Sequence, residues 1–254
     1  MTAPAQPALA VESVGLQIGG ARILADVSFS VPAGEMVGVI GPNGAGKTTL
    51  FNLISGVLKP TAGSIAINGQ DVTGVPVHRR AKAGLGRTFQ TSSLFPGLTV
   101  LENVRLCAQA RLGGSFSVLR FPGAGDAATR TARENIEEVG LTAKSSVAAG
   151  DLSHGDKRKV EIAMLLAGDP ALILLDEPMA GVASGDVPAL SAIIRRMHRD
   201  RGCTVMMVEH HMDVVLGLVD RVAVMHHGSL LAIDTPDAVM ADPTVQSAYL
   251  GEPV

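Results

Sequence analysis

A glycine-rich segment between an apolar strand and an amphipathic helix constrains this chain more than any other feature. Met36–Ile40 (MVGVI) is an apolar run typical of a buried strand. Gly41–Thr48 (GPNGAGKT) fits the pattern G-x-x-x-x-G-K-S/T, in which backbone N–H groups surround phosphate oxygens at a helix N-terminus. Apolar residues with helical spacing from Leu50 to Leu58 predict the helix that must follow, and Pro60 is its expected end. The segment therefore predicts a phosphate-binding strand, loop and helix.

The side chains of this segment favour a nucleoside triphosphate with Mg²⁺ as the ligand. Lys47 would reach the β- and γ-phosphates, and the hydroxyl of Thr48 would bind Mg²⁺. The other candidate nucleotide-binding residues of the loop are Gly41, Pro42, Asn43, Gly44, Ala45, Gly46 and Thr49. A structural glycine-rich turn is the alternative, but it would not require the flanking strand and helix. Because kinases, GTPases and transport ATPases share such a loop, it does not identify the enzyme class by itself.

A second apolar strand ends in two carboxylates. Ala171–Leu175 is followed directly by Asp176 and Glu177. Asp176 would hold Mg²⁺ through water, and Glu177 would polarise the water that attacks a phosphate. An acidic pair that only faces solvent at a strand end is the alternative. The phosphate-binding loop requires an acidic partner, and this favours the catalytic interpretation.

Short apolar runs that alternate with helical patterns predict an α/β fold. Apolar runs occur at Cys203–Val208 and Val222–Met225, and a helical pattern covers Val187–Arg201. Strands that alternate with helices favour a mainly parallel sheet covered on both faces. Ser64–Ile67 alternates in hydrophobicity and leads into Asn68-Gly69, which predicts a β-hairpin.

The middle of the chain has a different character. Residues 98–110 and 131–140 have helical patterns, whereas Arg111–Asp126 between them predicts a loop or insertion. Residues 1–10 are rich in Ala and Pro and are expected to form a flexible tail.

Composition limits the expected partners and compartment. Of the 254 residues, 46% are hydrophobic and 18% are charged, which is typical of a globular protein. A net charge of −3 provides no basic surface, so nucleic acid is not an expected partner. Cys107 and Cys203 lack the spacing of a metal or disulfide motif, which favours a reducing compartment. No apolar run approaches the roughly 20 residues that span a bilayer, so we expect a soluble cytoplasmic chain.

Separate segments of the chain together resemble the nucleotide-binding domain of ATP-binding-cassette (ABC) proteins. They are Gly41–Thr48, Gln90, Leu152–Asp156 (LSHGD), Asp176-Glu177 and His210. Their order and spacing match that family from about Val11 to Glu252. The resemblance implies an α/β, P-loop NTPase (RecA-like) fold, with a mainly parallel core sheet, an antiparallel β subdomain and an inserted helical subdomain.

The resemblance also implies how the chain is divided. Residues 11–254 would form a single nucleotide-binding domain, with its α/β core at about 11–90 and 165–235. The helical subdomain would cover about 91–164, and a C-terminal tail about 236–254.

The roles of individual residues follow from the same resemblance. Gln90 matches a glutamine that contacts Mg²⁺ and the attacking water, and His210 matches a histidine that bonds the γ-phosphate. Glu177, His210 and Gln90 are therefore the catalytic candidates, and Thr48, Gln90 and Asp176 are the candidates for Mg²⁺. Ser153 and Gly155 would contact the γ-phosphate of ATP bound to a second copy of the domain. Considered alone, Ser153 is a common type of helix N-cap.

Some positions depart from the family pattern. Ile18 stands where the family commonly stacks adenine on an aromatic ring, and it offers apolar contact only. His154 and Asp156 replace the usual Gly and Gln, and Ala183 occupies the position of an Asp that contacts the second subunit. We therefore expect weak adenine selectivity, and contacts through backbone or packing at Ala183.

Further stretches are similar to the ATPases that import branched-chain amino acids and amides such as urea. They are Gly86–Gln90 with Leu94–Asn103, the insertion at 111–130, and Glu209–Met212 with Tyr249–Glu252. The similarity implies a subunit that hydrolyses ATP with Mg²⁺ at the cytoplasmic face of the inner membrane. Its expected partners are transmembrane permease subunits, a second ATP-binding subunit in a homo- or heterodimer, and a solute-binding protein.

Two other functions remain as alternatives. One is the ATPase of an exporter for lipid or lipopolysaccharide. The other is a soluble ABC protein in DNA repair or translation, which usually carries a long coiled coil or tandem cassettes with a basic surface. The sequence shows neither of these patterns.

Overall fold

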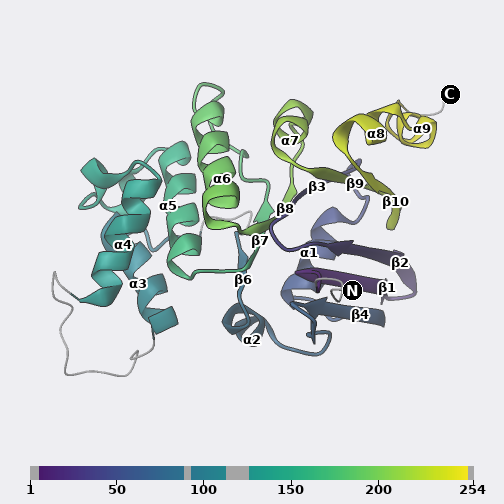
Figure 1. Ribbon diagram of the computed structural model, residues 1–254, viewed down its shortest axis with the longest axis horizontal. Helices are drawn as coiled ribbons and strands as arrows, with labels where there is room; N and C mark the ends of the chain where they lie inside the picture. Colours follow the sequence, from purple (N-terminus) through teal and green to yellow (C-terminus); the bar gives the residue numbers. More distant parts are fainter. Residues whose placement is uncertain (1–5, 89–92, 113–125, 251–254) are drawn as a thin grey trace, which may run out of the picture.

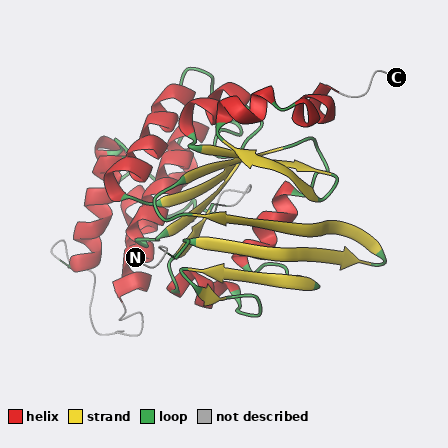
Figure 2. Ribbon diagram, turned by 45° about the vertical axis from the view of Figure 1, so that its right-hand side comes forward, coloured by secondary structure: helices red, strands yellow, loops and turns green. Residues whose placement is uncertain are grey.

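The computed structural model describes residues 6–88, 93–112 and 126–250. Their strands form two sheets, and helix α1 (Lys47–Ser55) packs against both of them. Figure 1 shows helices α3 to α6 gathered on one side of the molecule and the antiparallel strands on the other. The second view shows the same separation of helices from long strands (Figure 2).

The larger sheet has the strand order β10-β9-β3-β8-β7-β6. Its strands are β3 (Met36–Ile40), β6 (Leu85–Arg87), β7 (Leu172–Asp176), β8 (Thr204–Val208), β9 (Arg221–His226) and β10 (Ser229–Asp234). All neighbours pair in parallel except β9 and β10. Every residue of β3, β7 and β8 is buried, as expected for strands covered on both faces. The predicted mainly parallel core sheet is confirmed.

The smaller sheet is antiparallel, with the order β2-β1-β4-β5. Its strands are β1 (Leu9–Ile18), β2 (Ala21–Val31), β4 (Ala62–Ile67) and β5 (Gln70–Asp71). The turn between β4 and β5 is Asn68-Gly69, with φ of 49° and 74°, so the predicted hairpin is confirmed. Strand β1 begins at Leu9, and both Ala8 and Leu9 are buried. Ordered structure therefore starts before the domain boundary expected at Val11.

The helices follow the sequence patterns with some differences in length. They are α2 (Val77–Lys82), α3 (Val100–Leu112), α4 (Ala127–Glu138), α5 (His154–Ala167), α6 (Val187–Arg201), α7 (Met212–Leu218), α8 (Pro236–Ala241) and α9 (Pro243–Leu250), with short 3₁₀ turns at Thr142–Lys144 and Ala149–Asp151. Helix α3 includes Arg111 and Leu112 of the predicted insertion, residues 113–125 lie outside the described residues, and Asp126 is the N-cap of α4. Among the described helices, none combines the length and apolar character needed to cross a membrane.

The C-terminal segment, predicted to be a tail, is helical. Val239 of α8 and Val245 of α9 are buried and belong to the same core cluster as the inner residues of α6. Within the described part of the range 236–254, the segment therefore packs on the core through these apolar side chains.

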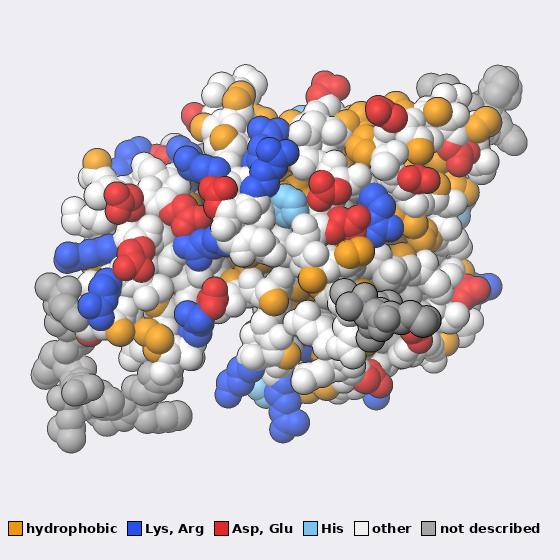
Figure 3. Space-filling view, in the orientation of Figure 1, with side chains coloured by type: hydrophobic (Ala, Val, Ile, Leu, Met, Phe, Trp, Pro, Cys, Tyr) orange, Lys and Arg blue, Asp and Glu red, His pale blue; other side chains and the backbone are white. Residues whose placement is uncertain are grey.

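The larger sheet separates two apolar clusters. Along β8, Val205 and Met207 pack with the helices α3 to α9, whereas Met206 and Val208 pack with α1 and the antiparallel strands. This alternation follows from the two-residue period of a strand. In the space-filling view, a notch lies between the helical part and α2, with Lys and Arg side chains on both rims (Figure 3).

A buried arginine fixes the end of α1. The helix ends at Ser55, before the predicted stop at Pro60, and Gly56 follows with φ of 82° in the left-handed conformation. Arg80 of α2 is only 1% exposed, and its Nη1 donates to the carbonyl oxygens of Leu53 and Ile54, each at 2.7 Å. A cation is favourable here because the last carbonyls of a helix lack partners within it and carry partial negative charge.

This contact generates the first prediction. Replacing Arg80 by Ala should lower the free energy of unfolding by about 3 kcal/mol, because buried carbonyl oxygens would lose a charged donor. Arg79→Ala is the control, since this neighbouring arginine is exposed and should change stability by less than about 0.5 kcal/mol. Urea denaturation measures both. Equal effects of the two substitutions would contradict a capping role for Arg80.

Candidate active site

The carboxyl ends of three neighbouring strands meet at one edge of the larger sheet. Strand β3 leads into Gly41, β7 ends at Asp176, and β8 ends at Val208. In the register of the sheet, Val208 lies beside both Val39 and Asp176. Ligands of parallel α/β sheets bind at this edge. The glycine-rich loop and the acidic pair, which are far apart in the sequence, are therefore neighbours.

A cavity of about 430 Å³ lies at this edge. It is lined by Ile23, Asn43, Gly44, Ala45, Gly46, Lys47, Thr48, Thr49, Glu177 and His210. The predicted phosphate-binding loop thus forms one wall, and two of the predicted catalytic residues form another. Gly41 and Pro42 do not line the cavity, and their carbonyl groups face Lys47 instead.

The loop geometry explains two of its glycines. Gly46 is the N-cap of α1 and has φ of 98°, a conformation that residues with a Cβ rarely adopt. A Cβ on Gly41 would overlap the carbonyl oxygen of Met225 on β9. Helix α1 has no acidic residue in its first turn and no side-chain cap, so the N–H groups of that turn are suited to an anion.

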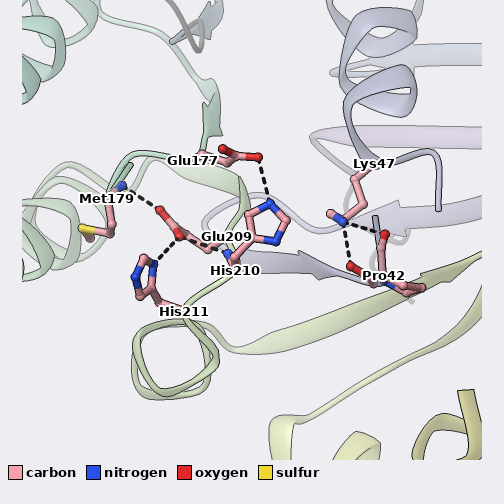
Figure 4. A network of polar contacts seen from close by, with 8 residues as sticks. Pro42, Lys47, Glu177, Met179, Glu209, His210 and His211 are labelled. Atoms are coloured by element: carbon pink, nitrogen blue, oxygen red, sulfur yellow. Dashed lines mark hydrogen bonds and ion pairs between the residues drawn. The ribbon is translucent and has the colours of Figure 1, made fainter. Parts of the chain in front are cut away.

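Lys47 places its positively charged ammonium group at the edge of the cavity. Its side chain is largely buried, and Nζ donates to the carbonyl oxygens of Gly41 at 2.6 Å and Pro42 at 3.0 Å (Figure 4). Burial lowers the pKa of this ammonium group, and the Glu177 carboxylate partly opposes the shift by raising it. A phosphate in the cavity would supply the negative charge that the buried ammonium group lacks.

Glu177 and His210 are paired on one wall of the cavity. Glu177 Oε1 lies 2.9 Å from His210 Nε2 (Figure 4). Glu177 has a left-handed φ of 50°, which is strained for a residue with a side chain. Its backbone N–H donates to the carbonyl of Val208 at 2.9 Å, and its carbonyl accepts from the N–H of Ala180 at 3.0 Å. These bonds hold the strained turn that directs the carboxylate into the cavity.

Asp176 has one oxygen that suits an ion. Its Oδ2 pairs with Arg87 Nη2 at 2.9 Å, and its N–H donates to Thr88 Oγ1 at 3.0 Å. Its Oδ1 is buried without a hydrogen-bond partner among the described residues. Such an atom is costly unless something binds it. Hydrated Mg²⁺ fits this oxygen, and the exposed hydroxyl-bearing Thr48 on the cavity wall is a second oxygen donor.

Sequence comparisons place the chain in a family. A family profile described as "ABC transporter" matches residues 24–180, and one described as "Branched-chain amino acid ATP-binding cassette transporter" matches residues 229–254. The chain is 37% identical over 253 residues to the "High-affinity branched-chain amino acid transport ATP-binding protein BraF" of Pseudomonas aeruginosa, covering 97% of this chain and 99% of that protein. The chain belongs to the ABC transporter family.

Other relatives agree with this assignment. The "High-affinity branched-chain amino acid transport ATP-binding protein LivG" of Escherichia coli is 36% identical over 252 residues, covering 97% of this chain and 99% of that protein. A solved nucleotide-free ATP-binding cassette from an ABC transporter has a TM-score of 0.84 at 32% identity, covering 97% of this chain and 100% of that one. The ADP conformation of the cassette MJ1267 also has a TM-score of 0.84, at 31% identity and with 97% and 99% covered. The predicted fold class is confirmed.

The segment Leu152–Asp156 lies apart from the cavity. Ser153 and Gly155 are at the start of α5, on the helical side, and neither lines the cavity. Ser153 Oγ accepts from the N–H of Asp156 at 3.2 Å, so Ser153 does cap the helix. Partial burial acts to raise the pKa of Asp156, but the hydrogen bond and charge of Lys144 and the charge of Lys159 outweigh it and lower the pKa. The Asp156 carboxylate is thus paired with lysine side chains of its own chain.

The remaining candidate residues differ in where they lie relative to the cavity. Ile18 lies at the end of β1, is 55% exposed and does not line the cavity, whereas Ile23 of β2 does. Ile23 was not predicted to line the site. Its position depends on the hairpin between β1 and β2, which brings it next to the glycine-rich loop. Gln90 lies outside the described residues. The pairing of Arg87 with Asp176 was also not predicted, although Arg87 is in the same motif as Gln90.

Lys47 gives the prediction for nucleotide binding. Lys47→Ala should weaken ATP binding by at least about 10²-fold, because two charge-assisted hydrogen bonds to phosphate would be lost. Isothermal titration with ATP measures this. Lys59→Ala is the matched control, because Lys59 is exposed beyond the end of α1 and should leave the dissociation constant unchanged. An unchanged constant in Lys47→Ala would exclude this loop as the phosphate site.

Proposed function

We propose that the chain is the ATP-hydrolysing subunit of an importer for branched-chain amino acids or related small solutes, including amides such as urea. The observation that carries this proposal is the match of residues 229–254 to the profile of branched-chain amino acid cassettes. That segment lies beyond the nucleotide-binding motifs, so it distinguishes among ATPases that share them. The names of the relatives BraF and LivG point to the same solutes.

The cavity residues support ATP hydrolysis by defined roles. Lys47 and the first-turn N–H groups of α1 would bind the phosphates, and Thr48 and Asp176 would hold Mg²⁺, with Gln90 as a further ligand. When bound, Mg²⁺ would neutralise charge on the transferred phosphate. Glu177 would accept a hydrogen bond from the attacking water and polarise it.

His210 would complete this arrangement in two ways. Its Nε2 orients the Glu177 carboxylate in the structure, and with ATP bound the exposed imidazole would bond the γ-phosphate. Ile23 offers an apolar surface at the cavity wall for the nucleoside, in place of the aromatic ring that is missing at Ile18.

The subunit would act within a larger complex. Ser153 and Gly155 do not line the cavity of their own chain, which supports a role in the site of a second ATP-binding subunit. ATP binding would close this dimer and hydrolysis would reopen it, moving transmembrane permease subunits between inward-open and outward-open states. We place the complex at the inner membrane, with this subunit attached peripherally at the cytoplasmic face and a solute-binding protein as a further component.

The role of Glu177 is tested by replacing it with Gln. Glu177→Gln should lower kcat for ATP hydrolysis by about 10² to 10⁴, since the amide is a far weaker acceptor for the proton of water. ATP affinity should stay unchanged, because the phosphate-binding groups belong to the glycine-rich loop and α1. Phosphate release and equilibrium binding measure the two quantities. Glu134→Gln, on the exposed side of α4, is the control. Near-normal hydrolysis by Glu177→Gln would eliminate the catalytic role.

The transported solute is tested on the purified complex. The tagged subunit is isolated from native membranes, partners are identified by mass spectrometry, and the complex is reconstituted in vesicles. Leucine, isoleucine or valine with the solute-binding protein should stimulate ATP hydrolysis severalfold, and Lys47→Ala should abolish the stimulation. Stimulation by amides or urea alone would assign the related solutes instead. Stimulation by lipid without a solute-binding protein would overturn the importer proposal in favour of an exporter.

A further inference from the structure

Glu209 is a buried carboxylate next to the active site that has no role in the proposed chemistry. It follows the last residue of β8, and its side chain is only 2% exposed. It does not line the cavity, so it is not placed to contact a nucleotide there. A buried carboxylate is costly unless several donors bind it. Its contacts therefore indicate what it does.

The carboxylate joins two loops of the site. Glu209 Oε1 accepts from the backbone N–H of Met179 at 2.6 Å, and Oε2 accepts from the backbone N–H of His210 at 3.1 Å (Figure 4). His211 Nδ1 lies 3.2 Å from Oε2, but the side chain of His211 is exposed. The first loop follows β7 and carries Glu177, and the second follows β8 and carries His210.

The Met179 contact bears directly on Glu177. The turn from Glu177 to Ala180 is closed by a backbone hydrogen bond of 3.0 Å, and Met179 lies within it. On its other side, the backbone N–H of Glu177 is held by Val208. The left-handed backbone of Glu177 is thus fixed by strand β8 before the turn and by Glu209 within it.

We propose that Glu209 is a positioning residue for ATP hydrolysis, which sets the relative placement of Glu177 and His210 through the backbone N–H groups of Met179 and His210. The proposal rests on the proposed catalytic role of Glu177. Two separate acceptor oxygens are needed to hold two loops, and an ionised carboxylate supplies them without any donor. Glutamine has the same shape but supplies one oxygen, so its NH₂ group would face one of the two N–H donors.

The main test separates turnover from binding. Glu209→Gln should lower kcat by roughly 10- to 100-fold, which is the scale of a small misplacement of reacting groups, while the dissociation constant for ATP changes by less than about 2-fold. Glu161→Gln is the matched control, since Glu161 is also a buried glutamate but lies on α5 and pairs with Arg158. It should leave both quantities unchanged. Equal losses of kcat and ATP affinity in Glu209→Gln would overturn the proposal.

Two more variants identify the route of the effect. In the double variant E177Q/E209Q, the loss of kcat should be smaller than the product of the two single losses, because Glu209 acts in part through Glu177. A fully multiplicative loss would show that Glu209 acts independently of Glu177 and would contradict the proposal. His211→Ala keeps both backbone contacts of Glu209, so its kcat should stay within about 2-fold of the unsubstituted chain. A loss as large as that of Glu209→Gln would assign the effect to the His211 side chain instead.

The result remains decisive if Glu209→Gln fails to fold. Glu209→Asp keeps the charge but is shorter, so it would reach one loop and lose the other. It should show the same selective loss of kcat, together with faster hydrogen exchange at the amide of Met179 or His210. Normal kcat in Glu209→Asp would overturn the proposal. If Glu177→Gln itself hydrolyses ATP normally, the proposed function of Glu177 fails, and a kcat loss in Glu209→Gln would then have to be assigned to another route.

Discussion

The parallel register of β3, β8 and β7 is the constraint on which the site depends. Each of these buried strands ends at the same edge, so the glycine-rich loop, His210 and the acidic pair meet although they are far apart in the sequence. The edge also collects buried polar groups: the Lys47 ammonium, an oxygen of Asp176 and the Glu209 carboxylate. Apolar packing on both faces of the sheet offsets the cost of burying them.

Short sequence patterns were sufficient to predict the elements that depend mainly on residues close together in the chain. The apolar runs of β3 and β7 are interrupted by nothing but one glycine, and helix α6 covers the same residues, Val187–Arg201, as its sequence pattern. The glycine-rich loop and Glu177 could be assigned because each follows directly after a buried strand, whereas His210, one residue further from its strand, was assigned from the family resemblance. For the loop and Glu177, position along the chain already determines position in the site.

The remaining features depend on contacts between distant residues. Helix α1 ends early because Arg80, from another helix, binds its last carbonyl groups. Ile23 rather than Ile18 lines the cavity because the twisted β1–β2 hairpin determines which side chain points to the loop. A single glutamate after a strand gives no signal that both of its oxygens will be bonded, so the contacts of Glu209 were not predictable.

The division of the interior by the larger sheet has a consequence for how this sequence can change over evolution. Met206 and Met207 are adjacent in the chain but belong to separate apolar clusters. Volume lost at Met206 can be restored only within the cluster that includes α1 and the antiparallel strands, whereas volume lost at Met207 must be restored within the cluster that includes the helices α3 to α9. A substitution that compensates for a change in one apolar cluster should therefore be sought in the same cluster, on the same face of the sheet. The residues of the two clusters can then change independently of each other.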